Sequence, residues 1–196
     1  IFTSDNGGAN YIELEDINKP FRGWKISFFE GGIRVPFIIS WPDKISPGLT
    51  SNSAVHHFDI FPTIVSATKT TTSNKKELDG VNLLPYIKKE NSDEPHETLF
   101  WRSGNHQSVL HKKWKYIVSK KENKSWLFDT SVDPLEKNNL IESHPKEAQK
   151  IEELLVQFNS EQKEPLFPSA FEAPIMIDKY DGQAYEEGDE YIYWSN

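Results

Sequence analysis

The chain has 196 residues, of which 36% are hydrophobic and 27% are charged, and its net charge is −8. This composition can form a packed core, either as one domain or as half of a larger domain with a small second domain. The negative charge argues against nucleic acid as a partner, because its phosphates would be repelled. No apolar run approaches the roughly 20 residues that cross a membrane, and the absence of cysteine excludes disulfides and thiolate metal sites.

The first residues predict a short strand that leads to polar side chains. Residues 1–3 favour β-structure, Asp5 and Asn6 follow them, and Gly7 and Gly8 come next. Carboxylate and amide oxygens at the end of a strand are ligands that a hard divalent cation prefers. The two glycines allow the sharp turn that such a site needs. Taken alone, the same residues fit an ordinary Asx turn equally well.

A lone lysine follows within a glycine-rich segment. Residues 9–20 are polar and predict a loop over the site, and Lys25 comes shortly after them. Lysine is a compact cation that can hold a tetrahedral anion, although an isolated lysine is more often a solvated surface charge. Glu30 and Arg34 predict a partly buried ion pair in preference to a catalytic role.

The middle of the chain predicts one buried strand and two helices. An almost continuous apolar run bounded by prolines is typical of a buried strand, and apolar residues on one helical face follow it. His56 and His57 are interpreted as surface or packing residues, because adjacent histidines point apart and no third metal ligand has a suitable spacing. The expected elements are a strand over 35–42, a helix over 59–67, a polar loop over 68–77, and a turn with a short helix over 79–87.

The pattern then changes to short β-favouring runs separated by polar turns, as in an antiparallel meander. An apolar stripe over 145–158 predicts an amphipathic helix across that sheet, with Pro145 near its start. The four expected strands cover residues 98–102, 107–110, 115–118 and 126–129.

These patterns divide the chain into residues 1–96, a small subdomain at 97–162 and an extended tail at 163–196. The tail carries no motif and is expected to pack on the larger body. Arg102 and His106 lie near the first turn of the subdomain sheet, where they could reach the rim of a cleft and bind a sugar or a second anionic group. Solvated turn residues are the more common role at such positions.

Two segments make the sequence resemble a known family. TSDNGG (residues 3–8) and FRGWKISFFEGGIRVPFIISWP (residues 21–42) resemble the second half of the catalytic domain of the type I, formylglycine-dependent sulfatases, in the alkaline-phosphatase-like superfamily. The resemblance covers residues 1–160 in the family's order. It continues through HFDIFPT (57–63), LDGVNLLP (78–85), WKY (114–116), LFD (127–129), DPLE (133–136) and NL (139–140).

The resemblance implies an α/β fold equivalent to the C-terminal part of a sulfatase, with the four-stranded antiparallel sheet and its helix as a small subdomain. It implies that Asp5 and Asn6 bind one calcium ion together with ligands outside this chain. It also implies that Lys25 holds the sulfate group and takes part in catalysis. The family's nucleophile is a formylglycine inside a C/S-x-P/A-x-R motif, and no such motif occurs in this sequence.

We therefore expect a C-terminal fragment whose partner is the N-terminal part of the same enzyme, in a periplasmic, secreted or lysosomal protein. The expected reaction is hydrolysis of a sulfate ester on a carbohydrate, where a metal and Lys25 neutralise the sulfate oxygens. The fragment alone should be inactive. Two alternatives stay open: a phosphate or phosphonate ester hydrolase of the same superfamily, or a catalytically inactive carbohydrate-binding or interaction module.

Overall fold

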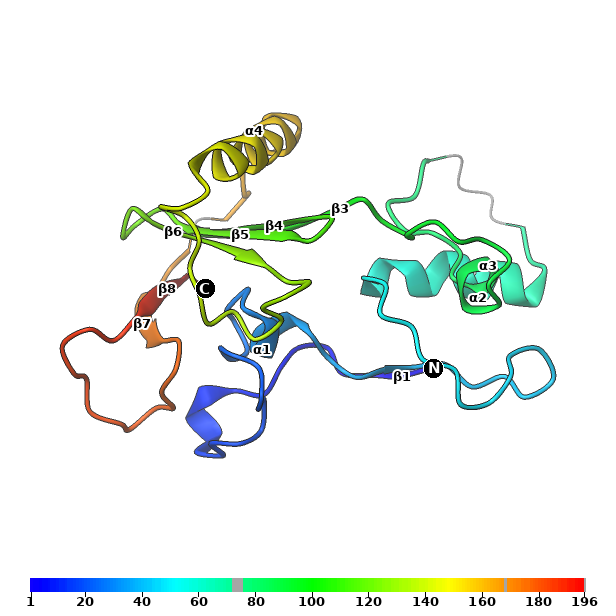
Figure 1. Cartoon of the computed structure of the whole chain (residues 1–196), viewed down its shortest axis with the longest axis horizontal. Helices are drawn as coiled ribbons and strands as arrows, with labels where there is room; N and C mark the ends of the chain where they lie inside the picture. Colours follow the sequence, from blue (N-terminus) through cyan, green and yellow to red (C-terminus); the bar gives the residue numbers. More distant parts are fainter. Residues whose placement is uncertain (72–75, 168, 196) are drawn as a thin grey trace. The chain divides into compact units, whose positions relative to one another are not determined.

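A four-stranded antiparallel sheet is the largest regular element of the protein (Figure 1). The structure is a computed structural model that describes residues 1–196 except 72–75, 168 and 196. The described residues form two units, one of residue 1 with 38–97 and one of residues 2–37 with 98–196. No helix among the described residues is long and apolar enough to cross a membrane.

The sheet lies in the larger unit and follows the predicted meander. Neighbouring strands are antiparallel and are joined in sequence order, so all pairing is local. Each strand is one or two residues longer than the pattern predicts, and the prediction is confirmed. The strands are β3 (Thr98–Ser103), β4 (His106–His111), β5 (Trp114–Ser119) and β6 (Lys124–Asp129).

One face of the sheet is covered by α4 (Pro145–Glu161), as Figure 1 shows. Successive side chains of a strand point to opposite faces, so every second residue of β4, β5 and β6 points to the face that the helix covers. Phe100 and Phe158 stack with their ring centroids 4.3 Å apart at the edge of this core. The helix begins at a proline, as predicted. The core residues of this face are Val109, Tyr116, Leu127, Ala148, Ile151 and Leu155.

The opposite face is covered by residues from both ends of the larger unit. Its core is a fully buried apolar cluster, which includes Phe29 from the N-terminal segment and Ile177 and Ile192 from the C-terminal segment. The C-terminal segment contains β7 (Glu172–Met176) and β8 (Tyr191–Ser195), which pair antiparallel. Residues 163–196 thus carry regular structure that no sequence motif indicated. The predicted domain limits at 96/97 and 162/163 stay predictions.

The N-terminal segment of the larger unit holds short elements only. They are β1 (Phe2–Thr3), the 3-10 turn η1 (Asn10–Ile12), α1 (Glu30–Ile33) and β2 (Phe37–Ile38), whose second residue belongs to the smaller unit, and β1 pairs with β2. The predicted buried strand over 35–42 is wrong, because only two residues are in a strand and Ile38 is 57% exposed. Prolines at both ends of the run remove backbone donors, and β1, the strand that pairs with β2, is equally short.

The smaller unit is organised around a buried carboxylate. Asp59 accepts hydrogen bonds from the backbone N–H of His56 at 2.7 Å and of Val81 at 2.8 Å, and His96 Nε2 lies 2.8 Å from its Oδ1. His56 also stacks on Phe58 with ring centroids 4.0 Å apart, which confirms a packing role. The helices of this unit are η2 (His57–Asp59), α2 (Ile60–Thr68) and α3 (Leu84–Ile87), as predicted, and part of the predicted loop lies outside the described residues.

Candidate functional site

Two loops of the larger unit are joined by backbone hydrogen bonds near the predicted ligands. The N–H of Gly7 donates to the carbonyl of Gly32 at 2.9 Å, and the N–H of Lys25 donates to the carbonyl of Gly8 at 2.9 Å. The turn that starts at Asp5 is therefore held against the segment that carries the lysine. The predicted roles of Asp5 and Asn6 as metal ligands and of Lys25 as an anion ligand stay predictions.

Asn18 fastens the same two loops with its side chain. Its amide nitrogen donates to the carbonyls of Gly8 at 2.9 Å and Gly23 at 3.1 Å, and its amide oxygen accepts from the N–H of Gly8 at 2.7 Å. All three of these hydrogen bonds are to backbone groups, so the residue fixes backbone positions. The sequence predicted only a loop here, because an asparagine within a polar stretch gives no signal of its partners.

The glycine pair of α1 is required by close packing of the backbone. A Cβ atom on Gly31 would lie 2.3 Å from the carbonyl oxygen of Gly23, and one on Gly32 would lie 2.1 Å from that of Ser27. Carbon atoms do not approach oxygen so closely, so any side chain would push the lysine loop away from α1. The Gly31 N–H donates to the carbonyl of Arg22 at 2.7 Å and completes the contact.

The lysine loop holds a residue in an unfavourable backbone conformation. Ile26, next to Lys25, has φ of 88°, which is rare for a β-branched residue. Ser27 closes the turn around it: its hydroxyl donates to the carbonyl of Trp24 at 2.8 Å and accepts from the Trp24 N–H at 3.1 Å. Such strain persists only where the surroundings fix the conformation, and it is concentrated at functional sites.

The predicted ligand side chains are accessible. Asp5 is exposed, while Asn6 and Lys25 are half-buried. Within the described part of the chain, no hydrogen bond or ion pair engages the side chains of these three residues, and no group of three or more histidine or acidic side chains could hold a metal. Asp5 and Asn6 offer oxygen donors that suit calcium, but a calcium ion takes about six to eight ligands. Asp5 and Asn6 by themselves therefore offer only part of the ligands that a calcium ion needs.

The structure does not bring Arg102 and His106 together. Arg102 is the cross-strand partner of Gln107, and His106 is the partner of Ser103, so the two side chains point to opposite faces of the sheet. Arg102 donates to Asn159 Oδ1 at 3.4 Å on the α4 face, where a hollow of about 150 Å³ lies beside it.

His106 is buried on the face of the lysine loop. It is 2% exposed and stacks on Phe28, with ring centroids 4.6 Å apart. Burial lowers the pKa of its imidazole to about 3, and the charge of Lys115 acts in the same direction while the backbone of Ile26 opposes them. The side chain is thus neutral at physiological pH and packs beneath the loop.

A buried ionic cluster that the sequence did not reveal supports α1. The Lys115 side chain is 0% exposed, and its Nζ lies 2.6 Å from Glu30 Oε1 and 2.8 Å from Glu136 Oε1. The other oxygen of Glu136 accepts from the Glu30 N–H at 2.6 Å. Burial works to raise the pKa of Glu30, but Lys115 and Arg34 outweigh it and lower that pKa, and the Arg34 contact confirms the predicted ion pair.

The sequence that forms this site can be compared with models of known protein families. The model of the family "N-sulphoglucosamine sulphohydrolase, C-terminal" matches residues 23–164. The chain belongs to the sulfatase family. It is therefore also a member of the alkaline-phosphatase-like superfamily, as its sequence resemblance implied. The match includes Lys25, the glycine pair of α1, and the sheet with α4.

Individual sulfatases agree with this assignment. N-acetylgalactosamine-6-O-sulfatase of Bacteroides thetaiotaomicron is 27% identical over 179 residues, which cover 79% of this chain and 35% of that protein. Human arylsulfatase H is 36% identical over 109 residues, covering 53% of this chain and 19% of that protein. The chain spans 18%, 25% and 35% of the first three relatives, so it corresponds to a minor part of each sulfatase.

Solved structures share the fold of this sulfatase chain. A Bacteroides thetaiotaomicron structure from work on the metabolism of multiple glycosaminoglycans superposes with a TM-score of 0.67 and 26% identity, over 81% of this chain and 38% of that one. The phosphonate monoester hydrolase of Agrobacterium radiobacter superposes with a TM-score of 0.54 and 20% identity, over 68% of this chain and 31% of that one. The second likeness shows the fold alone.

Proposed function

We propose that this chain supplies the sulfate-binding part of an active site that hydrolyses sulfate esters on a carbohydrate. The observation that carries the proposal is the bond from the Lys25 N–H to the Gly8 carbonyl, which holds the lysine loop against the turn of Asp5 and Asn6. Membership of the sulfatase family supports the reaction class. The identity to an N-acetylgalactosamine-6-O-sulfatase supports a sulfated sugar as the substrate.

The chemistry proposed for Lys25 follows from charge. Hydrolysis of R–O–SO3⁻ by water breaks the bond between sulfur and the leaving oxygen, and gives R–OH and hydrogen sulfate. Negative charge grows on the leaving oxygen in the transition state, while the other sulfate oxygens stay anionic. An ammonium group without another partner in the described residues can donate to these oxygens and stabilise that charge distribution.

The surrounding structure would hold the Lys25 backbone in place before substrate binds. The close contacts at Gly31 and Gly32 and the strained Ile26 fix the loop, so little reorganisation is needed during the reaction. A calcium ion bound by Asp5 and Asn6, together with ligands outside this chain, would add positive charge at the sulfate group. The nucleophile would also come from outside this chain.

Arg102 and His106 take different parts in the proposal. Arg102 lines a polar hollow and could contact a remote sugar or anionic group of a larger substrate. His106 is buried beneath Phe28, so it would affect substrate binding only through the lysine loop. The proposal that both residues contact substrate stays a prediction, and their positions on opposite faces predict separate effects.

A phosphonate ester is the second candidate substrate, because a phosphonate monoester hydrolase shares the fold. The full-length protein that contains this chain should be purified and its kcat/KM measured on an aryl sulfate and on a phosphonate monoester of the same aryl alcohol. The proposal predicts the higher kcat/KM for the sulfate. A higher value for the phosphonate would favour the second candidate. No turnover of either ester, with retained binding of a sulfated oligosaccharide, would identify a binding module.

A further inference from the structure

The arginine that precedes the lysine loop is held by the C-terminal segment of the chain. Arg22 Nε donates to Asp178 Oδ1 at 2.7 Å and its Nη2 donates to Asp178 Oδ2 at 2.7 Å, which is a two-point contact. The same Nη2 also donates to Glu190. The Arg22 side chain is only 14% exposed. Paired planar contacts of this kind fix orientation as well as distance.

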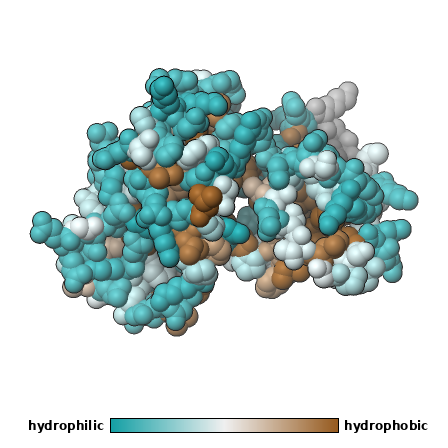
Figure 2. Space-filling model, viewed as in Figure 1, coloured by the Kyte–Doolittle hydropathy of each residue, from teal (hydrophilic) through white to brown (hydrophobic). Residues whose placement is uncertain are grey.

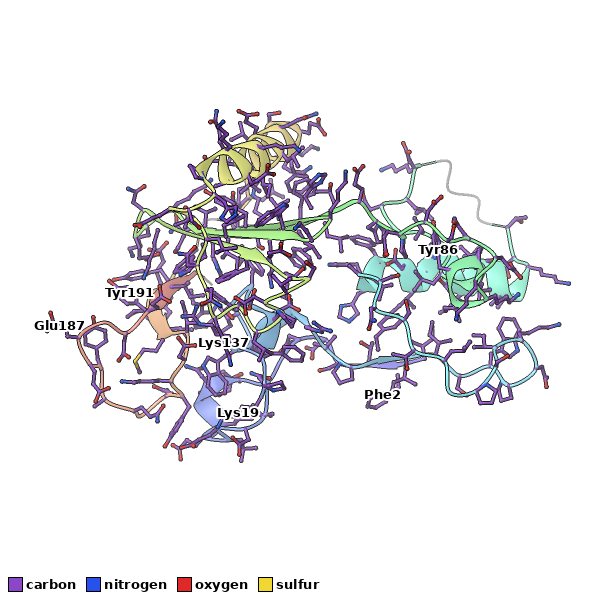
Figure 3. The ribbon with its side chains drawn as sticks, viewed as in Figure 1. Phe2, Lys19, Tyr86, Lys137, Glu187 and Tyr191 are labelled. Atoms are coloured by element: carbon purple, nitrogen blue, oxygen red, sulfur yellow. The ribbon has the colours of Figure 1, made fainter. Side chains whose placement is uncertain are left out.

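Both carboxylates belong to one hairpin, defined here as residues 172–195. Asp178 comes shortly after β7, and Glu190 comes directly before β8. The pair therefore holds Arg22 from the segments that flank the two strands, one after β7 and one before β8. Figure 1 shows β7 and β8 beside each other on the side of the sheet opposite α4, and Figure 3 shows Tyr191 at the start of β8.

The hairpin packs against the four-stranded sheet. Ile177 and Ile192 are 0% exposed in the core that also contains Trp126. Glu190 Oε1 accepts from the indole N–H of Trp126 at 2.9 Å and lies 2.7 Å from Lys124 Nζ. Burial works to raise the pKa of Glu190, but its donors, Arg22 first among them, lower it to about 2. The hairpin therefore meets Arg22 with a charged group whose position is fixed.

The other contacts of Arg22 reach the site. Its guanidinium lies 5.0 Å from the centre of the Phe29 ring, and its Nη1 donates to the backbone carbonyl of Glu136 at 3.3 Å. Its own carbonyl accepts from the N–H of Gly31. Arg22 is three residues before Lys25, so its side chain and backbone together set one end of the lysine loop.

We propose that the C-terminal hairpin is a brace that positions the lysine loop through Arg22, and that Arg22 is a positioning residue for Lys25. The hairpin lies after the residues 23–164 that the family model matches, so the brace is an addition to the matched part of the fold. Its effect on turnover rests on the proposed function. Its effect on the order of the loop does not.

The test removes the charges that grip Arg22 and leaves the shapes of the side chains. In the full-length protein, Asp178→Asn with Glu190→Gln should speed amide hydrogen exchange in peptides covering residues 23–32 about tenfold. The sheet peptides should be unchanged. On an aryl sulfate, kcat should fall about tenfold while KM stays within about a factor of two, because a misplaced cation loses transition-state contacts.

The matched control is Glu186→Gln with Asp189→Asn. These two carboxylates lie in the same hairpin and pair with Lys179 at 2.9 and 2.7 Å instead of with Arg22. Figure 3 shows the neighbouring Glu187 in the hairpin loop. The control should change neither exchange in residues 23–32 nor kcat.

Amide hydrogen exchange tests whether the hairpin acts as a brace, and turnover of a sulfate ester tests the proposed function. If the double variant exchanges like the control over residues 23–32, the brace is overturned. If the loop exchanges faster but the wild-type protein hydrolyses no sulfate ester, the brace stands and the proposed function fails. If the double variant exchanges faster throughout because it unfolds, Arg22→Lys decides, since it keeps the charge and loses the two-point contact. Unchanged loop exchange in Arg22→Lys would overturn the brace.

Discussion

Lys115→Met should strongly destabilise the protein, because it leaves buried Glu136 without its cation and leaves Glu30 with only the more exposed Arg34. The lysine side chain is 0% exposed and contacts Glu30 at 2.6 Å and Glu136 at 2.8 Å, while Glu136 is also 0% exposed. Removing one partner of such a buried group costs about 3 to 5 kcal/mol. We expect a loss of this size in the free energy of unfolding at about pH 8, measured by urea denaturation of the 196-residue chain.

The loss should depend on pH, and its sign follows from the carboxyl groups. In the wild type, the lowered pKa of Glu30 means that its contribution is present above the unfolded pKa of 4.5 and is lost as the pH falls through the folded pKa. Without Lys115, burial and mutual repulsion raise the pKa of both carboxyls. The folded variant then binds protons more tightly than the unfolded chain, so its deficit should shrink between about pH 8 and pH 5.

Two further variants show whether the stranded charge is the cause. Lys113→Met makes the same change two residues away, where the lysine pairs with Asp129 at 2.6 Å but is 51% exposed, and it should cost about 1 kcal/mol or less. Combining Lys115→Met with Glu136→Gln should recover part of the loss. If Lys115→Met costs no more than Lys113→Met, or if its deficit is independent of pH, the account of the cluster is wrong.

Three other predictions concern single features. Burial keeps the wild-type His106 imidazole neutral with a pKa of about 3, whereas the imidazole of the unfolded chain takes up a proton as the pH falls from 7 to 5. The free energy of unfolding, measured by urea denaturation, should therefore fall by about 2 kcal/mol more in the wild type than in His106→Phe over this range, and equal decreases would contradict the burial of His106. Arg102→Ala in the full-length enzyme should raise KM for a sulfated oligosaccharide and leave a small aryl sulfate unaffected, and equal effects on both would remove Arg102 from the substrate site. The 196-residue chain alone should hydrolyse no aryl sulfate and should bind calcium weakly by calorimetry, because it offers only Asp5 and Asn6 as obvious ligands; activity above background would contradict the proposal that the nucleophile lies outside this chain.

Local patterns predicted the four-stranded sheet and α4 of the larger unit well. The strands β3 to β6 and helix α4 follow from alternation and from an apolar stripe, since each element needs only its own residues to be recognised. The apolar run at 35–42 led to the wrong prediction of a buried strand. Such a run shows only that a strand would be stable if other elements covered it, and the two-stranded sheet of β1 and β2 leaves Ile38 exposed.

Long-range polar contacts could not be predicted from the sequence. Lys115 lies in a strand of alternating pattern, where a lysine normally faces solvent. It is buried because Glu30 and Glu136, which come from distant segments, pair with it on the face of the sheet opposite α4. Arg22 gave no sign of its partners in the hairpin, which are more than 150 residues away along the chain. The mostly hydrophilic face in Figure 2 likewise gives no indication of the ionic groups within.

The central claim is that Lys25 binds the sulfate group during catalysis, and one comparison tests it most directly. In the full-length enzyme, kcat/KM for an aryl sulfate should be measured for Lys25→Ala and for Lys19→Ala, whose lysine is exposed on the preceding loop and pairs only with Asp16 among the described residues (Figure 3). Lys25→Ala should lose about two to three orders of magnitude, equivalent to about 3 to 4 kcal/mol of transition-state stabilisation, with little change in its unfolding midpoint. Lys19→Ala should keep wild-type turnover. A Lys25→Ala enzyme with turnover close to that of Lys19→Ala would contradict the account.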